Sequence, residues 1–178
     1  MEINGVAHVV LTVNRFDACV SFYDQVMPEL GLQALHRAED FVYDIGGRTA
    51  LALRRADSRY EADVHVPDRP GIHHLCFRAR SREDIDQLYG FLQGIGANMV
   101  RAPEEGPWAP GYYSLSVLDP AGIRLEVNHV PGKGVFAEGA SFQPAPGYPV
   151  TGRPRPTARA EAGVMGDNHI GGASHGEG

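Results

Sequence analysis

The sequence predicts an α+β domain built from two copies of one βαβββ module. Residues 5–13 read GVAHVVLTV and residues 71–79 read GIHHLCFRA, and these two stretches superpose on His8 and His74 at an offset of 66 residues. A helix-start signal follows each stretch, a polar residue with an acid three positions later. A repeat of this length indicates one supersecondary unit present twice, with a function seated between the copies.

The first copy covers about residues 4–56. Its opening stretch, residues 6–13, is rich in β-branched residues and predicts a strand. A helix is expected over about 15–30, because apolar residues recur there at spacings of three and four, and Gly31 ends it. The expected helix cap is Asn14. Short runs bounded by turn residues predict three strands, at 32–38, 40–45 and 49–55.

The second copy, residues 71–130, repeats this order after a charged linker over 56–70 that contains two prolines. A strand is expected at 72–79 and a helix at 82–95. The segment 103–110 contains EEGPWA between two prolines and predicts a loop that covers a cavity. The remaining apolar runs predict three strands, at 97–102, 111–118 and 123–130.

The composition changes after residue 130. Residues 131–178 contain 11 of the 22 glycines and 6 of the 13 prolines, without periodicity. Such a composition predicts a disordered tail, because too little apolar surface is present to offset the entropy of ordering it. The domain organisation expected is therefore a domain over 1–130 and a tail over 131–178. Whether residues 131–143 cover the site stays open.

Charge and composition exclude several classes of function. A net charge of −6 argues against a nucleic-acid surface or a polybasic membrane anchor. No run approaches the roughly 18 apolar residues of a membrane span, and no secretory pattern opens the chain. The two cysteines, Cys19 and Cys76, stand in apolar stretches and are expected to be buried and reduced. We therefore expect a soluble cytoplasmic protein that binds a small molecule.

Glu126 is the acidic residue of greatest interest. It lies in DPAGIRLEVNH (119–129), where a turn precedes a strand that places Arg124, Glu126 and Asn128 on one face. A carboxylate in a strand built for burial needs a partner, and a salt bridge to an arginine is one alternative. With His8 and His74 it forms instead a set of two histidines and one carboxylate, which suits Fe(II), Mn(II) or Zn(II).

The two βαβββ copies, the strand-borne histidines and the DPxGxxLE motif ending in Glu126 resemble the vicinal oxygen chelate superfamily. That superfamily includes the glyoxalases, the bleomycin- and fosfomycin-resistance proteins and the extradiol dioxygenases. The resemblance covers about residues 4–130. It implies a half-open mixed β-barrel around one divalent ion, with His8, His74 and Glu126 as metal ligands. It also implies a homodimer.

Two departures from the superfamily pattern bear on the reaction. Glyoxalase-like members take a fourth ligand from the last strand of the first copy, where Leu51 aligns with Glu126 and Ala50 or Ala52 are next. None of these can bind a metal or act as a base. Extradiol dioxygenases carry a tyrosine three residues before the Asp-Pro pair and a histidine upstream of it. This chain has Ser116 at the former position and no histidine between 74 and 129.

Five further residues are candidates for the site. Arg124 and Asn128 share the face of Glu126 and are expected to orient an anionic or carbonyl substrate, with a salt bridge at the rim as the alternative. Trp108, Tyr112 and Tyr113 are expected to line the pocket, with exposed loop aromatics as the alternative. Tyr113, Arg124 and Asn128 are the candidates for a catalytic role.

These observations favour a divalent-metal-dependent enzyme. The interpretation preferred is a non-heme Fe(II) dioxygenase that acts on a small oxygenated metabolite, since Fe(II) with open positions serves oxygen chemistry. The alternatives are a lyase, isomerase or thiol transferase that uses Mn(II), Zn(II) or Ni(II), and a metal-free protein that sequesters a drug. Relatives of the last kind tend to lose the three ligands, whereas this chain keeps all three.

Overall fold

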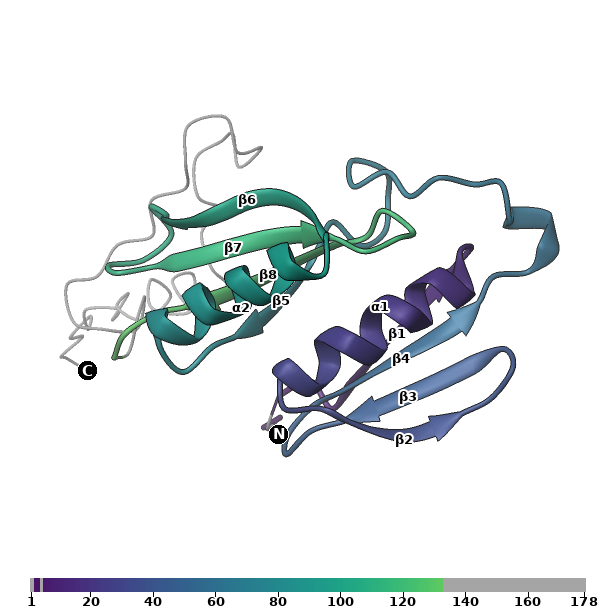
Figure 1. Cartoon of the computed structure of the whole chain (residues 1–178), viewed down its shortest axis with the longest axis horizontal. Helices are drawn as coiled ribbons and strands as arrows, with labels where there is room; N and C mark the ends of the chain where they lie inside the picture. Colours follow the sequence, from purple (N-terminus) through teal and green to yellow (C-terminus); the bar gives the residue numbers. More distant parts are fainter. Residues whose placement is uncertain (1, 4, 133–178) are drawn as a thin grey trace, which may run out of the picture. The chain divides into compact units, whose positions relative to one another are not determined.

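The computed structural model describes residues 2–3 and 5–132. The predicted tail lies outside this part of the chain from residue 133 onward. The described residues form two helices, eight strands and one short 3-10 helix (Figure 1). In chain order these elements are β1 (His8–Val13), α1 (Phe16–Glu29), β2 (Gln33–Arg37), β3 (Phe41–Ile45), β4 (Ala50–Arg55), η1 (Ser58–Tyr60), β5 (Leu75–Arg78), α2 (Arg82–Gly94), β6 (Asn98–Glu105), β7 (Tyr113–Leu118) and β8 (Arg124–His129).

The strands form two separate four-stranded sheets with the same topology. Sheet A has the strand order β1-β4-β3-β2, and sheet B has the order β5-β8-β7-β6. In each sheet the first pair is parallel and the other two pairs are antiparallel. Neither sheet closes on itself, so each module leaves two edge strands. This confirms the α+β class and the two βαβββ modules of a half-open mixed barrel.

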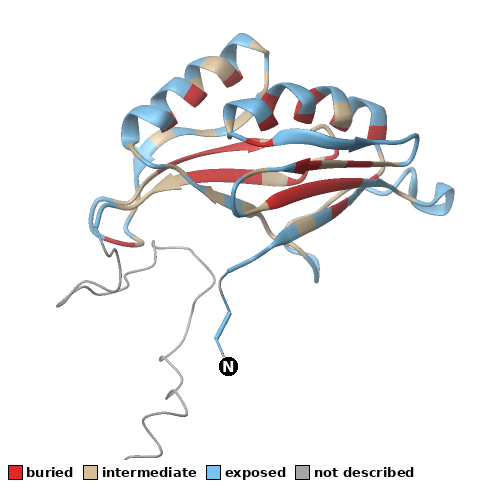
Figure 2. Ribbon diagram, turned by 90° about the horizontal axis from the view of Figure 1, so that it is seen from below, coloured by how far each residue is buried: buried red, intermediate tan, exposed pale blue. Residues whose placement is uncertain are grey.

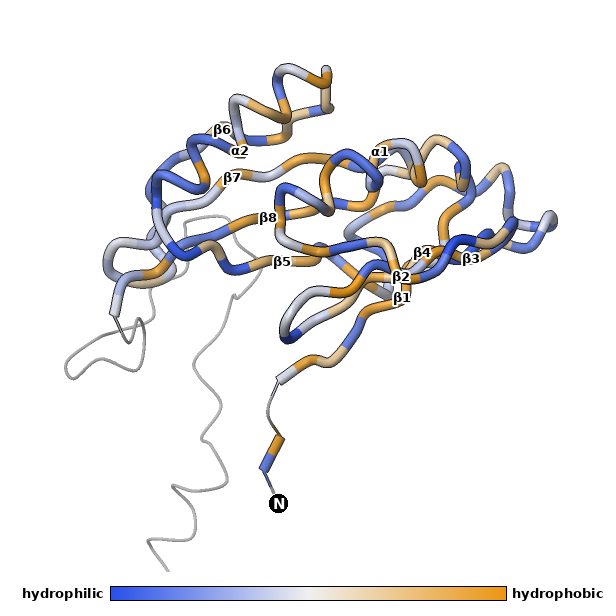
Figure 3. The backbone as a smooth tube through the Cα atoms, turned by 60° about the horizontal axis from the view of Figure 1, so that its bottom comes forward, coloured by the Kyte–Doolittle hydropathy of each residue, from blue (hydrophilic) through white to orange (hydrophobic). Residues whose placement is uncertain are grey.

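Each helix covers one face of the sheet of its own module, and the core lies between them. In Figure 2 the buried residues lie between the helices and the strands, and Figure 3 shows the apolar residues concentrated in the strands. Burying one leucine side chain of such a core contributes about 1.5–3 kcal/mol. The residues of α1 and α2 that are buried in it are Phe16, Cys19, Phe22, Tyr23, Val26, Met27, Ile85, Leu88 and Leu92.

The two predicted helix caps have different outcomes. Ser81 and Asp84 form the expected capping box of α2: the Ser81 hydroxyl accepts from the Asp84 N–H at 3.1 Å, and the Asp84 carboxylate from the Ser81 N–H at 3.0 Å. The prediction that Asn14 caps α1 is wrong, because the cap residue is Arg15 and no side chain bonds there. The Asn14 amide instead donates to the carbonyls of Glu61 and Asp63, which holds the linker against the end of β1.

Candidate functional site

Glu126 lies on β8 in the interior of sheet B, where its side chain is held by groups from three other segments. The Tyr112 hydroxyl donates to Oε1 of Glu126 at 2.6 Å. The Arg101 guanidinium donates to the same oxygen at 3.3 Å, and Nε2 of His74 lies 3.4 Å from Oε2. The buried carboxylate, 9% exposed, therefore has the partners that its burial requires.

Strand alternation explains why the polar groups gather on this face. The register pairs Glu126 with Cys76 on β5 and with Ser116 on β7, so these residues share a face. The opposite face packs against α2 and is apolar: it carries Leu75, Phe77, Leu115, Val117, Leu125 and Val127. Cys76 is exposed on this face, so the expectation that it is buried is wrong.

His74 lies just before β5 and is oriented by its neighbour His73. The two Nδ1 atoms are 2.7 Å apart, which leaves Nε2 of His74 directed at Glu126. The two adjacent histidines do not alternate as strand residues would, because the strand begins only at residue 75. Burial lowers the pKa of His74 more than the Glu126 carboxylate raises it. His74 is therefore neutral near pH 7, the form in which imidazole binds metals.

His8 lies in the other sheet. It is exposed on the edge strand β1, pairs with Ala50, and its ring centroid is 6.5 Å from that of Tyr43. Among residues 2–3 and 5–132, no three histidine, cysteine, aspartate or glutamate side chains form a group that could hold a metal ion. One chain thus brings together His74 and Glu126, two of the three predicted ligands, and their donor chemistry suits a divalent ion.

The structure also locates the counterpart of Glu126 in the first module. The register pairs Val10 with Ala52 in sheet A, as it pairs Cys76 with Glu126 in sheet B. Val10 and Cys76 each follow the repeated histidine by two residues, so Ala52 is the counterpart of Glu126. The sequence aligns Leu51 with Glu126 and offers Ala50 or Ala52 next; the register selects Ala52, and Leu51 belongs to the core. The position carries no metal-binding side chain.

Tyr112 and Trp108 line the loop beside Glu126. Their rings approach the backbone of Gly106 so closely that a Cβ there would lie 3.0 Å from the Trp108 ring and 3.1 Å from the Tyr112 ring. Burial and the bond to Glu126 raise the pKa of Tyr112 above its usual value, so the hydroxyl stays protonated and donates. The Asn128 side chain also lies at this hydroxyl. The structure thus places Tyr112 and Asn128 near the carboxylate, and Trp108 beside Gly106 in the same loop as Tyr112.

Tyr113 lies on the other face of β7. Its hydroxyl donates to Asp86 on α2 at 2.7 Å, and the guanidinium of Arg82 stacks on its ring at 4.1 Å from the centroid. The next residue, Ser114, points to the Glu126 side. We therefore do not include Tyr113 among the site residues.

Sequence reasoning missed Arg101 and Ser114. The Arg101 guanidinium donates to the Ser114 hydroxyl at 2.6 Å as well as to Glu126. The register of β6 shifts on both sides of Arg101, so simple alternation does not place it. The available signal was in β7, where Ser114 and Ser116 alternate with Leu115 and Val117.

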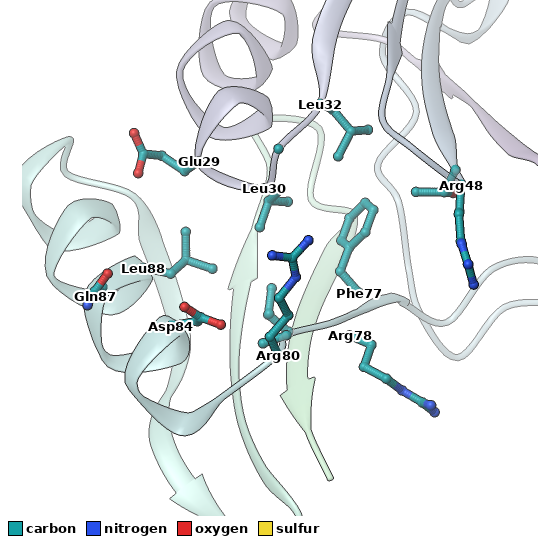
Figure 4. Close-up of a pocket in the computed structure, with 14 residues that line it drawn as sticks. Glu29, Leu30, Leu32, Arg48, Phe77, Arg78, Arg80, Asp84, Gln87 and Leu88 are labelled. Carbon is teal, nitrogen blue, oxygen red and sulfur yellow. The ribbon is translucent and has the colours of Figure 1, made fainter. Parts of the chain in front are cut away.

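A cavity of about 670 Å³ lies on the helix side of sheet B and is distinct from this site (Figure 4). Phe77 and Val127, from the apolar face of β5 and β8, contribute to its lining, and Glu126, His74 and Tyr112 do not. In Figure 4 the Arg80 side chain extends between Leu30 and Phe77. The cavity and the surroundings of the Glu126 carboxylate are therefore separate candidate sites.

The part of the chain that the structure describes has no helix that is long and apolar enough to cross a membrane. Comparison with known proteins finds a family model, described as the glyoxalase/bleomycin resistance protein/dioxygenase superfamily, that matches residues 5–127. Virulence protein STM3117 of Salmonella typhimurium is 27% identical over 129 residues, which are 72% of this chain and 85% of that protein.

Two solved structures show the same fold. A glyoxylase/bleomycin resistance protein/dioxygenase domain from Frankia sp. EAN1pec aligns with a TM-score of 0.59 at 27% identity, over 72% of this chain and 98% of that one. A lactoylglutathione lyase from Agrobacterium tumefaciens aligns with a TM-score of 0.56 at 24% identity, over 72% of this chain and 95% of that one. At 24% identity, the similarity to the lactoylglutathione lyase shows a shared fold alone. Since the family model covers both modules, the chain belongs to the glyoxalase/bleomycin resistance protein/dioxygenase superfamily.

Proposed function

We propose that this protein is a divalent-metal-dependent enzyme whose ion is held by His8, His74 and Glu126. The observation that carries the proposal is the convergence of His74 and Glu126: Nε2 of one and Oε2 of the other lie 3.4 Å apart. A neutral imidazole and a carboxylate at this separation can bind the same ion. The second carboxylate oxygen is occupied by Tyr112 and Arg101, which fixes the orientation of the first.

The third ligand, His8, comes from a second copy of the chain in this proposal. Within the sheets that the described residues form, β1 and β5 are both edge strands, each paired on one side. The face of sheet A that carries His8 also exposes apolar side chains, with Val10 47% and Ile45 41% exposed. An uncovered apolar sheet face of this kind is typical of a surface that pairs with a partner. A homodimer would cover it and supply the missing imidazole.

The remaining residues have separable roles. Arg124 and Asn128, on the face of Glu126, orient the substrate, and Trp108 and Tyr112 form the wall beside it. A divalent ion bound there would polarise the oxygen atoms of a bidentate substrate or provide a place for O₂. The chain's own groups bind and orient the substrate, and Tyr112 keeps its proton next to the carboxylate.

The reaction that we favour is oxygen chemistry by a non-heme Fe(II) dioxygenase on a small oxygenated metabolite. Ala52 stands where a glyoxalase-type enzyme would place its fourth carboxylate, so the usual base for proton transfer is absent. Three protein ligands leave positions open for a substrate and O₂. The same donor set also accepts Mn(II), Zn(II) or Ni(II), which keeps a lyase, isomerase or thiol transferase as the second candidate.

Anaerobic reconstitution of the metal-free protein with Fe(II), Mn(II) or Zn(II) separates these reactions. Catechols, 2-hydroxycarbonyl compounds and thiol adducts are then screened while oxygen uptake is followed. We expect turnover with Fe(II) that consumes O₂. Turnover without oxygen consumption, equally fast with Zn(II), would reject the dioxygenase and support the second class. Ligand binding without metal and without turnover would indicate a sequestering protein.

A further inference from the structure

The face of sheet B that carries Glu126 holds more guanidinium groups than carboxylates. Arg78 on β5 and Arg124 on β8 lie on it, and Arg101 reaches it from β6. Among the described residues of this face, the acidic ones are Glu126 and the exposed Glu104, whose Oε1 is 3.6 Å from Nε of Arg101. The register places neutral side chains around them on this face: Cys76, Ser114, Ser116, Leu118 and Asn128. The face is therefore positively charged in a chain whose net charge is −6.

Several N–H donors of these arginines lack a hydrogen-bond acceptor among the described residues. Within the described residues, Nε of Arg101 and Nε of Arg124 are buried without a hydrogen-bond partner. Arg78 makes no hydrogen bond or ion pair with any described residue. A buried donor without a partner costs about 1–3 kcal/mol. Such donors, grouped beside a candidate site, indicate a ligand that supplies acceptors.

The three guanidinium groups act on the same region. Leu75 pairs with Leu125 in the parallel register, so Arg124 is adjacent to His74 where β5 begins. The charges of Arg124 and Arg101 both lower the pKa of His74. Arg78 pairs with Asn128, one alternation beyond Glu126. It lies at the border of the cavity, and in Figure 4 its side chain extends away from Phe77. Their donors therefore face the space in front of Glu126.

We infer that the substrate of this site carries an oxyanion group, a carboxylate, phosphonate or phosphate, which Arg78, Arg101 and Arg124 bind. This rests on the proposed function and adds the class of substrate to it. The planar guanidinium fork matches two oxygens of such a group, and charge-assisted hydrogen bonds are the strong ones. A divalent ion on Glu126 would neutralise the principal opposing carboxylate and make the face more positive.

The test compares phenylphosphonate with methyl phenyl sulfone, which has a similar tetrahedral shape and no charge. Both are titrated calorimetrically into the metal-free protein and into the zinc-loaded protein. We expect phenylphosphonate to bind at least about tenfold more tightly than the sulfone in both forms. Arg124→Gln and Arg78→Gln should each reduce that preference about tenfold. Arg80→Gln, an equal loss of charge two residues beyond Arg78, should leave it within about twofold.

The outcomes separate this inference from the proposed function. Equal binding of the two probes, or no binding of either, would overturn the oxyanion site even if zinc binds with full stoichiometry. A preference that Arg80→Gln reduces as much as Arg124→Gln and Arg78→Gln do would also overturn it, since it would reflect net charge alone. Selective phenylphosphonate binding in a protein that does not retain zinc would sustain the oxyanion site and reject the metal site. Near-ultraviolet circular dichroism checks that each variant is folded.

Discussion

The hydroxyl of Tyr112 donates to Oε1 of Glu126 at 2.6 Å, and this bond leaves Oε2 as the oxygen that faces His74. The loop that precedes β7 thereby orients a carboxylate on β8. Groups that orient a ligand in this way are worth about 10–100-fold in metal affinity.

Tyr112→Phe should therefore weaken zinc binding about tenfold while leaving the fold intact. Competition titration against a chromogenic chelator measures the change. Tyr113→Phe is the matched control, because its hydroxyl bonds to Asp86 on α2 and not to Glu126. If both variants bind zinc as the wild type does, Tyr112 has no part in the metal site.

The protonation of Asp119 should make the free energy of unfolding depend on pH. This carboxylate joins the two modules: it accepts from the Tyr23 hydroxyl at 3.0 Å and from the Ala121 and Ile123 N–H groups at 2.9 and 2.8 Å. Burial nevertheless raises its pKa above the usual value of about 3.8. Between the pKa of Asp119 in the unfolded chain and its higher pKa in the folded protein, the folded protein holds a proton on Asp119 that the unfolded chain has already lost.

The contribution of Asp119 to the free energy of unfolding should accordingly be greatest at low pH and fall as the pH rises through that window. Urea denaturation of the wild type and of Asp119→Asn from pH 4 to pH 7 measures it. We expect the stability difference, wild type minus variant, to decrease with pH and then level off. A difference that increases with pH would mean that the three hydrogen bonds outweigh burial.

Ala52→Glu tests the correspondence between the two modules. Ala52 is 0% exposed, so a new carboxylate there should cost at least about 1–3 kcal/mol in the metal-free protein. Zinc should recover part of this loss, because the new carboxylate would lie where Glu126 lies in the other sheet. Thermal denaturation with and without zinc checks this. Ala50→Glu, on the same strand and face, should be destabilised without comparable recovery.

Pairs of inactive variants test whether two chains share each site. His8→Ala and His74→Ala should each lose metal binding as homodimers. The heterodimer of the two variants is isolated by sequential purification on two different tags. One of its two sites keeps His8 from one chain and both His74 and Glu126 from the other. We expect it to bind about one ion per dimer. Absence of metal from the heterodimer would show that the ligands do not come from two chains.

The module plan could be predicted from the sequence because its signals are local. The histidine repeat, the helical apolar stripes and the Ser81–Asp84 capping box each depend on neighbouring residues, and the structure confirms the elements that they predict. Asn14 does not cap α1, because its side-chain amide hydrogen-bonds to the distant linker at Glu61 and not to the first turn of the helix. The surroundings of Glu126 were only partly predictable, since Arg101 reaches it across two register shifts. Tyr112 and Tyr113 are adjacent in sequence but belong to opposite faces.

The most direct test of the central claim is the metal content per chain of the purified protein after loading with zinc and removal of the excess. The account predicts one ion per chain for the wild type and less than about one tenth for His74→Ala and for Glu126→Ala, because each variant removes one of two converging ligands. His36→Ala, a histidine on the exposed strand β2, is the control and should retain a full ion. Full metal content in His74→Ala and Glu126→Ala would contradict the account.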